Sequence, residues 1–376
     1  MSPRRRRRRR DRKEQTVSEE SFWKDLNLRI KRGEVIPIIS NSARNDRIFD
    51  VDYDYDLGLS TGEADPHAEG LNVEEELAQE WAEEIGYPLL SDRHRLARVA
   101  VYNRVKSFDD QQAKTGYLRF LRQYLLDVAE EDQKVADLVA DLREQADVLS
   151  FSEIACQLDY PSFKDVCDDT LRLLAKLPLP IYVTTSYYDF MERALQAEGK
   201  PSRTQICFLF GEPVGIAPEH CPDPSLVPTP EEPLVYHLHG LERYPESLVL
   251  SEDDYLEFLV RVSEESKESK APLIPLYLSA ALAESSLILL GYRLHDWDFR
   301  VVFRGLIKAK HISLRKFSLA IQLDPVEQRE IANTEEARNY LKTYFEPEKF
   351  IVEWGTTDSF VKKLCQKWDE WRGCQA

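Results

Sequence analysis

The sequence lacks the patterns that mark several common classes of protein. No segment of its 376 residues reaches the roughly 18 consecutive apolar residues that a membrane-spanning helix needs. The arginines near the start are not followed by an apolar stretch, so we do not expect a secretory signal. No segment recurs at a fixed period, which argues against a repeat architecture. The absence of a membrane-spanning segment and of a secretory signal predicts a cytoplasmic protein.

Paired cysteines are absent as well. The chain has six cysteines, and none of them forms a CxxC pair. Zinc ribbons and thioredoxin-like redox sites are built on such pairs, so we predict neither a metal site nor a redox site. Free thiols fit the reducing cytosol, where disulfides are rare. The six are Cys156, Cys167, Cys207, Cys221, Cys365 and Cys374.

Charge is unevenly distributed along the chain. The formal net charge is −17, although residues 1–13 hold nine basic side chains and only one acidic side chain. The acidic remainder repels phosphate backbones, so nucleic acid is expected to bind only through the basic arm, if at all. The run from Arg4 to Arg10 is either a solvated, disordered tail or an electrostatic arm for an anionic partner, and the sequence leaves both open.

Short apolar runs alternate with helical patterns, and this alternation predicts the fold class. Hydrophobic residues make up 43% of the chain, enough for a large core. The first strand is expected at 35–39, although Pro37 within it cannot donate a ladder hydrogen bond and is unusual in a central strand. We predict an α/β fold with a Rossmann-like, mostly parallel sheet flanked by helices. Further strands are expected at 181–185, 206–210, 234–238, 287–290, 317–321 and 350–354, and further helices at 187–198, 252–265, 273–284 and 296–309.

A long helical stretch interrupts the strand pattern. Residues 71–176 show almost no strand signal and carry apolar residues at three- and four-residue spacing, as amphipathic helices do. We therefore expect a helical insertion or cap at 71–176, within a Rossmann-type domain formed by 21–70 and 177–370. Residues 1–20 are expected to be a disordered basic arm, and the proline-rich segment 211–233 a surface loop.

Polar residues follow four of the expected strands directly. In an open parallel sheet, ligands bind beyond the carboxyl ends of the strands, so these clusters form the candidate site. Each cluster also has a purely structural interpretation. Ser186 and Asp296 could each cap a helix. Gly240 could provide only a turn, and His239 could be a structural histidine whose hydrogen bonds are satisfied within the protein. The clusters are Ser40-Asn41-Ser42 with Arg44 and Arg47 nearby, Thr185 to Asp189, His239-Gly240, and Gly291-Tyr292 with Asp296 and Asp298.

The order and content of these clusters resemble the bacterial SIR2-like domain family, whose members occur in antiphage-defence proteins. The resemblance covers residues 30–365. It is most specific in residues 236–255, YHLHGLERYPESLVLSEDDY, and in residues 289–300, LLGYRLHDWDFR. Residues 184–195, TTSYYDFMERAL, come next, and the loop after the first strand is the weakest match.

The resemblance implies an NAD⁺ site and a role for each matching residue. It implies that His239 acts on the nicotinamide ribose during glycosidic cleavage. It also implies that Ser186 and Asp189 orient the nicotinamide side and the attacking water. Arg44 and Arg47 could be solvated charges, although guanidinium groups also suit a diphosphate. The residues expected to bind NAD⁺ are Ser40, Asn41, Ser42, Arg44, Arg47, Thr185, Gly240, Gly291, Tyr292 and Asp296.

Several loop positions depart from the family pattern. Ser40 and Ser42 stand where glycines usually let the backbone approach the dinucleotide phosphates, although serine hydroxyls can still bond phosphate. Ser186 stands where asparagine is usual. Tyr188 stands where aspartate is usual, with Asp189 one residue later.

The resemblance implies an NAD⁺ glycohydrolase that releases nicotinamide and ADP-ribose as a regulated effector in bacterial antiphage defence. The altered loops favour an alternative, a catalytically degenerate sensor or scaffold that binds NAD⁺ or ADP-ribose. Sirtuin deacylases usually carry a four-cysteine zinc module, so protein deacylation is not expected. The expected partners are a second copy of the chain and an ATPase or other defence subunit, with no membrane.

Overall fold

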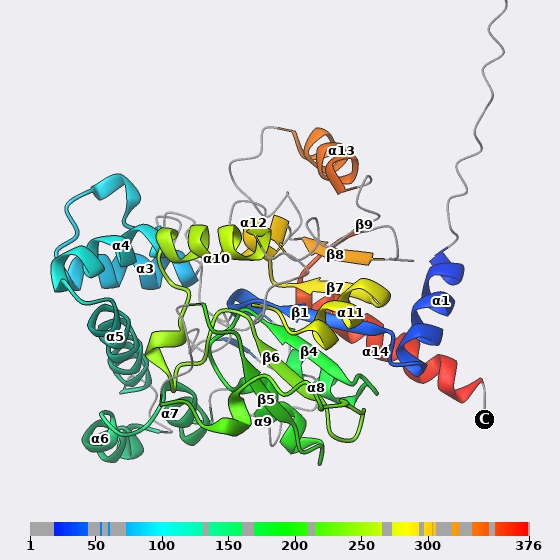
Figure 1. Ribbon diagram of the computed structural model, residues 1–376, viewed down its shortest axis with the longest axis horizontal. Helices are drawn as coiled ribbons and strands as arrows, with labels where there is room; N and C mark the ends of the chain where they lie inside the picture. Colours follow the sequence, from blue (N-terminus) through cyan, green and yellow to red (C-terminus); the bar gives the residue numbers. More distant parts are fainter. Residues whose placement is uncertain are drawn as a thin grey trace, which may run out of the picture.

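The computed structural model describes residues 19–43, 53–54, 59–60, 73–130, 135–159, 169–209, 215–264, 273–292, 297–302, 304–305, 318–322, 333–345 and 350–374. Among these, seven strands form one parallel sheet in the order β5-β6-β4-β1-β7-β8-β9, with helices on both faces (Figure 1). The predicted α/β, Rossmann-like fold is therefore confirmed. The strands are β1 (Val35–Ile39), β4 (Ile181–Thr184), β5 (Arg203–Ile206), β6 (Leu234–His237), β7 (Ser286–Leu290), β8 (Ser318–Gln322) and β9 (Phe350–Trp354), and a separate antiparallel pair joins β2 (Tyr53–Asp54) to β3 (Leu59–Ser60).

The central strand β1 contains a proline. Every residue of β1 and of β7 is buried, as a parallel sheet covered on both faces requires. The Ile39 carbonyl accepts a hydrogen bond from β4, so the nitrogen of Pro37, two residues earlier, faces β4 as well. The pairing of β1 with β4 begins only at Ile38. Pro37 has no N–H to donate, but it lies just before the residues of β1 that pair with β4. The proline is therefore compatible with this position in a central strand.

Two apolar layers cover the sheet. One layer contains α1 (Glu19–Lys31), α8 (Thr170–Lys176), α9 (Phe190–Ala197) and α14 (Thr357–Gly373). The other contains α10 (Glu252–Glu264), α11 (Leu276–Glu284), α12 (Trp297–Val301) and α13 (Thr334–Phe345). Alternate strand residues enter the two layers, as the two-residue period of a strand dictates. In β6, Val235 packs into the first layer, and Leu234 and Tyr236 pack into the second.

The edge strand β5 was predicted in the wrong place. The expected strand was 206–210, whereas β5 spans Arg203–Ile206. This strand lies at the edge of the sheet and its first residue, Arg203, is exposed, so it lacks the continuous apolar run of a central strand. Cys207 and Leu209 are buried in the core although they lie outside the strand. The other predicted strands agree with the structure to within one residue at each end.

A helical insertion was predicted at 71–176, between β1 and β4. However, α8 at the end of this range packs in the first layer on the sheet, so the name insertion is used below for the helices before it. The insertion contains α3 (Val73–Glu84), α4 (Leu96–Ser107), α5 (Asp110–Glu130), α6 (Ala136–Gln145) and α7 (Phe151–Gln157), and these helices lie beyond the carboxyl ends of the strands (Figure 1). Tyr117 of α5 reaches Tyr187, which follows β4, with 3.2 Å between the two hydroxyl oxygens. The insertion therefore sits at the edge of the sheet where α/β folds of this type bind ligands.

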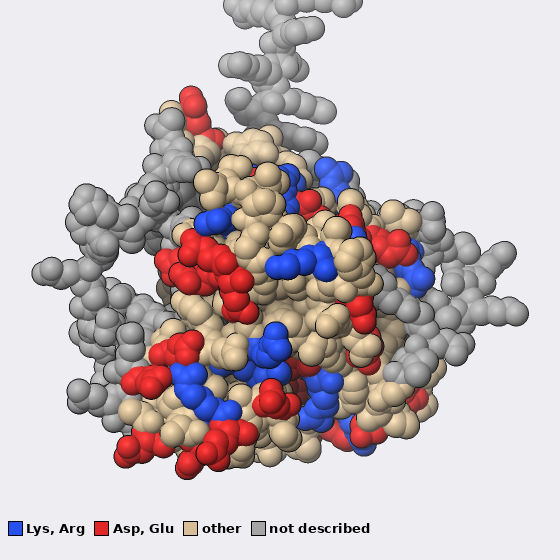
Figure 2. Space-filling model, turned by 90° about the vertical axis from the view of Figure 1, so that its left-hand side faces the viewer, with Lys and Arg blue, Asp and Glu red and all other residues tan. Residues whose placement is uncertain are grey.

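Ion pairs hold the insertion against α10. Acidic and basic side chains lie side by side on this face of the molecule (Figure 2). Lys114 and Asp254 are both buried, and the Lys114 Nζ lies 3.7 Å from Asp254 and 2.7 Å from Asp110. Burial removes both charges from water, so removing one partner and leaving the other charge buried costs more than breaking a surface pair. Three consecutive acidic residues of α10 are matched in this way, in the pairs Arg98–Glu252, Arg104–Asp253 and Lys114–Asp254.

We predict that Lys114→Met lowers the free energy of unfolding by about 3 kcal/mol, because it leaves the buried Asp254 carboxylate without this cation. The matched control is Lys367→Met, which removes the half-exposed Lys367–Glu370 pair and should cost less than about 1 kcal/mol. Urea unfolding followed by circular dichroism measures both. Equal losses in the two variants would show that the buried pair does not hold the insertion.

Candidate functional site

The ends of β1 and β7 approach each other closely. The Ser40 N–H donates to the Leu290 carbonyl at 3.0 Å, and the Ser40 Oγ donates to the Gly291 carbonyl at 2.6 Å. Gly291 has a φ of +77°, and a Cβ there would lie 2.5 Å from the backbone nitrogen of Ala43. Both the dihedral and the space therefore require glycine at this position. The chain leaves β1 for β4 on one side and returns to β7 on the other, which makes this a topological switch point, the place where open α/β sheets bind ligands.

The end of β4 is bonded to the ends of both β1 and β7. The Ile39 carbonyl accepts hydrogen bonds from Thr184 Oγ1 at 3.0 Å and from the Thr185 N–H at 2.8 Å. Thr185 Oγ1 lies 3.0 Å from the Tyr292 hydroxyl, and both side chains are buried. Two of the predicted binding residues, Thr185 and Tyr292, thus hold together the loops that follow β4 and β7.

A narrow pocket opens beside the ends of β1 and β4. It contains about 320 Å³ of empty space, part of it open to solvent, which is small for a ligand pocket. Of the predicted residues, Ser40, Asn41 and Ser186 line it, and Asn41 begins the short helix η1 (Asn41–Ala43). Asn41 Oδ1 is buried and has no hydrogen-bond partner within the described ranges, so it can accept from a ligand. The other walls are Ile39, Leu171, Thr184, Tyr188, Phe190 and Met191.

Ser186 closes a turn and does not cap α9. The helix begins at Phe190 rather than at residue 187, and Asp189 occupies the N-cap position. The Ser186 Oγ accepts a hydrogen bond from the Tyr188 N–H at 3.3 Å, as serine hydroxyls do in tight turns. The helix-cap interpretation of Ser186 is therefore wrong.

The Asp189 side chain is engaged within the protein. Its Oδ2 accepts a hydrogen bond from Arg193 Nη2 at 3.0 Å, one turn along α9. Its backbone N–H donates to the Ser152 Oγ of α7 at 3.2 Å. A carboxylate has further lone pairs, so Asp189 can still accept from water or a ligand, but only around the guanidinium of Arg193.

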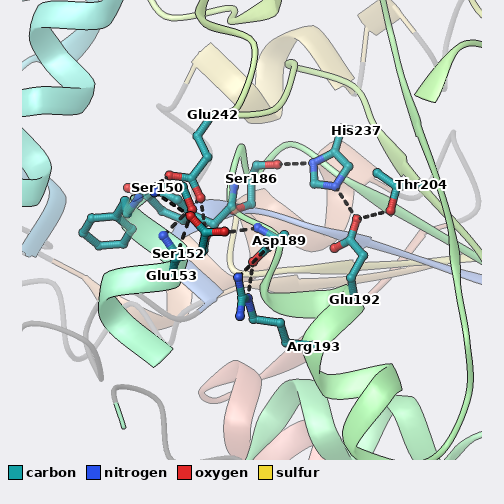
Figure 3. A network of polar contacts seen from close by, with 12 residues as sticks. Ser150, Ser152, Glu153, Ser186, Asp189, Glu192, Arg193, Thr204, His237 and Glu242 are labelled. Carbon is teal, nitrogen blue, oxygen red and sulfur yellow. Dashed lines mark hydrogen bonds and ion pairs between the residues drawn. The ribbon is translucent and has the colours of Figure 1, made fainter. Parts of the chain in front are cut away.

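His237, the last residue of β6, supports the Ser186 turn. The ring is fully buried, with Nδ1 2.8 Å from the Ser186 carbonyl and Nε2 2.8 Å from Glu192 Oε1 (Figure 3). Thr204 Oγ1 donates to the same Glu192 oxygen at 2.8 Å. Burial disfavours charge on both side chains, but their mutual attraction outweighs it. This attraction raises the pKa of His237 and lowers the pKa of Glu192.

Glu242 connects the loop after β6 to the insertion. Its buried carboxylate accepts hydrogen bonds from the backbone N–H groups of Phe151 at 2.8 Å and Ser152 at 3.1 Å, and from the Ser152 hydroxyl (Figure 3). Burial raises the pKa of Glu242 to about 7, although these donors favour the ionised form. The Glu242 N–H also donates to the Tyr187 carbonyl at 2.8 Å. One residue thus joins the insertion to the loops after β4 and β6.

His239 lies on the other side of the sheet from His237. Residues two apart share a face within a strand, but β6 ends at His237 and His239 turns toward α10. The buried imidazole lies edge-on to Tyr255 and Phe258, with ring centroids 5.3 and 5.5 Å away. Tyr255 in turn stacks on Trp297 at 6.2 Å. Aromatic contacts therefore link His239 to the segment that follows β7.

Packing within the chain accounts for Gly240. This residue has a φ of +85°, and a Cβ there would lie 2.3 Å from the carbonyl oxygen of Ser247. The short helix η4 (Pro245–Ser247) therefore fills the space beside Gly240. The turn interpretation explains this glycine without a ligand.

The structure brings together some of the residues predicted from the sequence, but not all of them. Ser40, Thr185, Gly291 and Tyr292 are joined by the contacts above, whereas the contacts described for the His239 ring are with Tyr255 and Phe258 of α10. Ser42 belongs to η1, and its side chain lies outside the described residues, as do Arg44, Arg47 and Asp296. Within the described ranges, no group of three or more His, Cys, Asp or Glu side chains could hold a metal.

Sequence reasoning missed the supporting residues Glu192, Glu242 and Ser152. Glu242 and Ser152 lie 90 residues apart in the chain, and no local pattern indicates that they meet. Glu192 lies within the motif that carried the resemblance, but the pattern gave it no role.

The fold is that of an α/β protein with a parallel sheet, a class in which ligands bind at the carboxyl ends of the strands. Residues 180–345, from the start of β4 to the end of α13, match the SIR2-like domain family. The chain therefore contains a SIR2-like domain at 180–345, which confirms the predicted resemblance over these residues and implies an NAD-binding protein, whereas the loop after β1 lies outside the match. No curated protein matches the sequence. Within the described residues, no helix has the length and apolar content needed to cross a bilayer.

We predict that Gly291→Ala destabilises the protein more than Gly199→Ala does. Both glycines have a positive φ, +77° and +71°, but a Cβ at 199 meets nothing within 4 Å. Gly199→Ala should cost about 1–2 kcal/mol from the left-handed dihedral alone. Gly291→Ala should cost a further 1–3 kcal/mol or so, because the methyl overlaps the loop after β1. Thermal unfolding compares the two, and equal losses would contradict the close approach.

A second prediction concerns the pH dependence of stability. The pKa of Glu242 is about 7 in the folded chain and near 4.5 in an unfolded one. The native state therefore keeps a proton that the unfolded chain releases, so ionisation of Glu242 lowers stability as pH rises through this window. Relative to wild type, Glu242→Gln should gain up to about 3 kcal/mol between about pH 5 and about pH 8.

Denaturant unfolding at the two pH values measures this change. Any effect of the glutamine amide that does not depend on pH cancels when the free energies of unfolding at the two pH values are compared. The control is Glu231→Gln, at an exposed carboxylate, whose difference from wild type should stay constant. A constant difference for Glu242→Gln would mean that Glu242 stays ionised in the native state.

Proposed function

We propose that the protein binds NAD⁺ at the carboxyl ends of β1, β4 and β7 and hydrolyses it to nicotinamide and ADP-ribose. The observation that carries the proposal is the SIR2-like domain at 180–345, whose loop after β4 lines the pocket together with the loop after β1. The proposed catalytic residues are His239, Ser186 and Asp189. The proposed binding residues are Ser40, Asn41, Ser42, Arg44, Arg47, Thr185, Gly240, Gly291, Tyr292 and Asp296.

The chemistry of the pocket suits the nicotinamide end of NAD⁺. Asn41 Oδ1 can accept from the carboxamide N–H or from a ribose hydroxyl. Phe190 and Met191 provide apolar walls for a flat ring. The diphosphate would lie toward Arg44 and Arg47, because the rest of the chain is acidic and offers anions little attraction.

The proposed reaction is displacement at the anomeric carbon of the nicotinamide ribose. Water forms a bond to C1′ while the C1′–N bond breaks, and the bonding pair leaves with neutral nicotinamide. The attacking water releases one proton to the surrounding solvent, so the products are nicotinamide, ADP-ribose and one proton. His239 would accept a hydrogen bond or proton from a ribose hydroxyl as positive charge develops on the sugar. Ser186, assisted by Asp189, would orient the water.

A second candidate function is a sensor or scaffold that binds NAD⁺ or ADP-ribose without cleaving it. The observation that favours it is that several predicted groups are already bonded within the protein. The Ser40 hydroxyl bonds Gly291, the Thr185 hydroxyl bonds Tyr292, and the Asp189 carboxylate pairs with Arg193. Groups that are already bonded within the protein hold the loops of a site in place, and they are less available to exchange protons with a substrate.

The cellular role and the division of the chain follow as proposals from the family resemblance. We propose a regulated effector in bacterial antiphage defence that acts as a homo-oligomer or with an ATPase or other defence subunit. Its SIR2-like domain would comprise 21–70 and 177–370, the insertion 71–176 would cap the site, and residues 1–20 would form the basic arm.

We predict that the purified full chain releases nicotinamide from NAD⁺, and that His239→Ala reduces the rate by about 10²-fold or more, the usual scale for an acid–base group. Chromatography of the products measures the rate. His94→Ala, in the insertion, is the control and should leave the rate unchanged. Equal rates in wild type and His239→Ala would refute the mechanism. An inactive wild type that binds NAD⁺ would establish the sensor, and one that does not bind would refute both functions.

A further inference from the structure

Both nitrogens of the His237 ring face oxygen acceptors. Nδ1 lies 2.8 Å from the Ser186 carbonyl, and Nε2 lies 2.8 Å from Glu192 Oε1. A neutral imidazole carries a single N–H, so it could donate to only one of these oxygens and would turn a lone pair toward the other. Burial alone would raise the pKa of Glu192, but its contacts with His237 and Thr204 lower it, so the carboxylate is ionised and only accepts. Then only the doubly protonated ring satisfies both contacts. The geometry with an ionised Glu192 therefore favours an imidazolium.

The surroundings of His237 support its positive charge. Glu192 approaches from α9, and Asp189, just before that helix, adds a second negative charge. His220, in the short helix η3 (Pro218–His220), is the opposing titratable group, and burial together with nearby positive charge lowers its pKa. Thr204 of β5 fixes the Glu192 oxygen by its own hydrogen bond. The net balance favours charge on His237, and its pKa is raised.

The imidazolium holds a residue of the proposed site. The Ser186 carbonyl is fixed from the sheet side by His237, and the Ser186 hydroxyl is fixed by the Tyr188 N–H. Ser186 also lines the pocket beside β1 and β4. We propose that the His237–Glu192 ion pair is a positioning element that fixes the Ser186 turn for NAD⁺, and that loss of the His237 proton releases this turn.

The direction of the pH effect follows from the charges. A histidine with a raised pKa contributes its stabilisation fully below the unfolded value of 6.5 and loses it as pH rises through the folded value. The turn should therefore loosen on the alkaline side. The inference rests on the proposed function for its ligand, but the state of the turn can be measured without any ligand.

Glu192→Gln is the decisive variant. The glutamine N–H can donate to Nε2 of a neutral ring, whose remaining proton on Nδ1 then bonds the Ser186 carbonyl. Both contacts survive without charge, so the turn should become insensitive to pH. His237→Ala removes both contacts at every pH. Glu198→Gln is the matched control, because it breaks the Arg172–Glu198 pair at the end of the same helix.

The first measurement is hydrogen–deuterium exchange of the segment 185–190, corrected for the intrinsic effect of pH. Between about pH 6.5 and about pH 9, protection should fall in wild type and in Glu198→Gln, stay constant in Glu192→Gln, and be low throughout in His237→Ala. The same pH dependence in wild type and Glu192→Gln overturns the proposal, even where His237→Ala fails to fold.

The second measurement is the pH profile of NAD⁺ binding and kcat/KM in the same proteins. Misplacement of a site by about an ångström can cost up to about 10²-fold, so we expect at least a tenfold fall at high pH in wild type and none in Glu192→Gln. A turn that loosens while NAD⁺ binding and turnover stay constant overturns the positioning role and leaves the proposed function standing. No NAD⁺ binding at any pH, with the exchange pattern as expected, overturns the proposed function and with it the assignment of the turn to NAD⁺.

Discussion

The site depends on how the last peptide group of β1 is bonded. Its carbonyl, from Ile39, accepts from the end of β4, and the next N–H, from Ser40, donates to the end of β7. These bonds set the distance between the loops on either side of the switch point, and Gly291 allows the approach because it has no side chain. The loop after β1 is therefore a structural joint as well as a candidate ligand contact, which explains why serine is compatible with this position.

Much of the fold could be predicted because its signals are local. The central strands are continuous apolar runs, and such runs are long enough to stand out from the helical pattern around them. Topology then brings the polar residues that follow parallel strands to one edge of the sheet, so Ser40, Thr185 and Gly291 could be expected to meet. The edge strand β5 was predicted in the wrong place because its first two residues are not buried. The buried residues that follow it, Cys207 and Leu209, gave a stronger apolar pattern.

The rest of the site could not be predicted because it depends on contacts between distant segments. The hydrogen bond between Glu242 and the start of α7 joins residues far apart in sequence, and no pattern in either segment predicts it. The function of His237 is also hidden, since a histidine in an apolar strand resembles any buried polar residue until its two acceptors are known. At Gly240, packing within the chain already requires a glycine, because a Cβ there would overlap Ser247, and the sequence alone could not show this contact.

The contacts of the insertion make it unsuitable as an interchangeable module. Glu242 relies on the backbone of α7 for hydrogen-bond donors, Asp254 relies on Lys114 for a cation, and Tyr187 bonds Tyr117. Each partner in the core is buried and polar, so a core transplanted without the insertion would carry unsatisfied groups at the mouth of its own site. A chimera that exchanges this insertion for another must therefore change core residues at the same time.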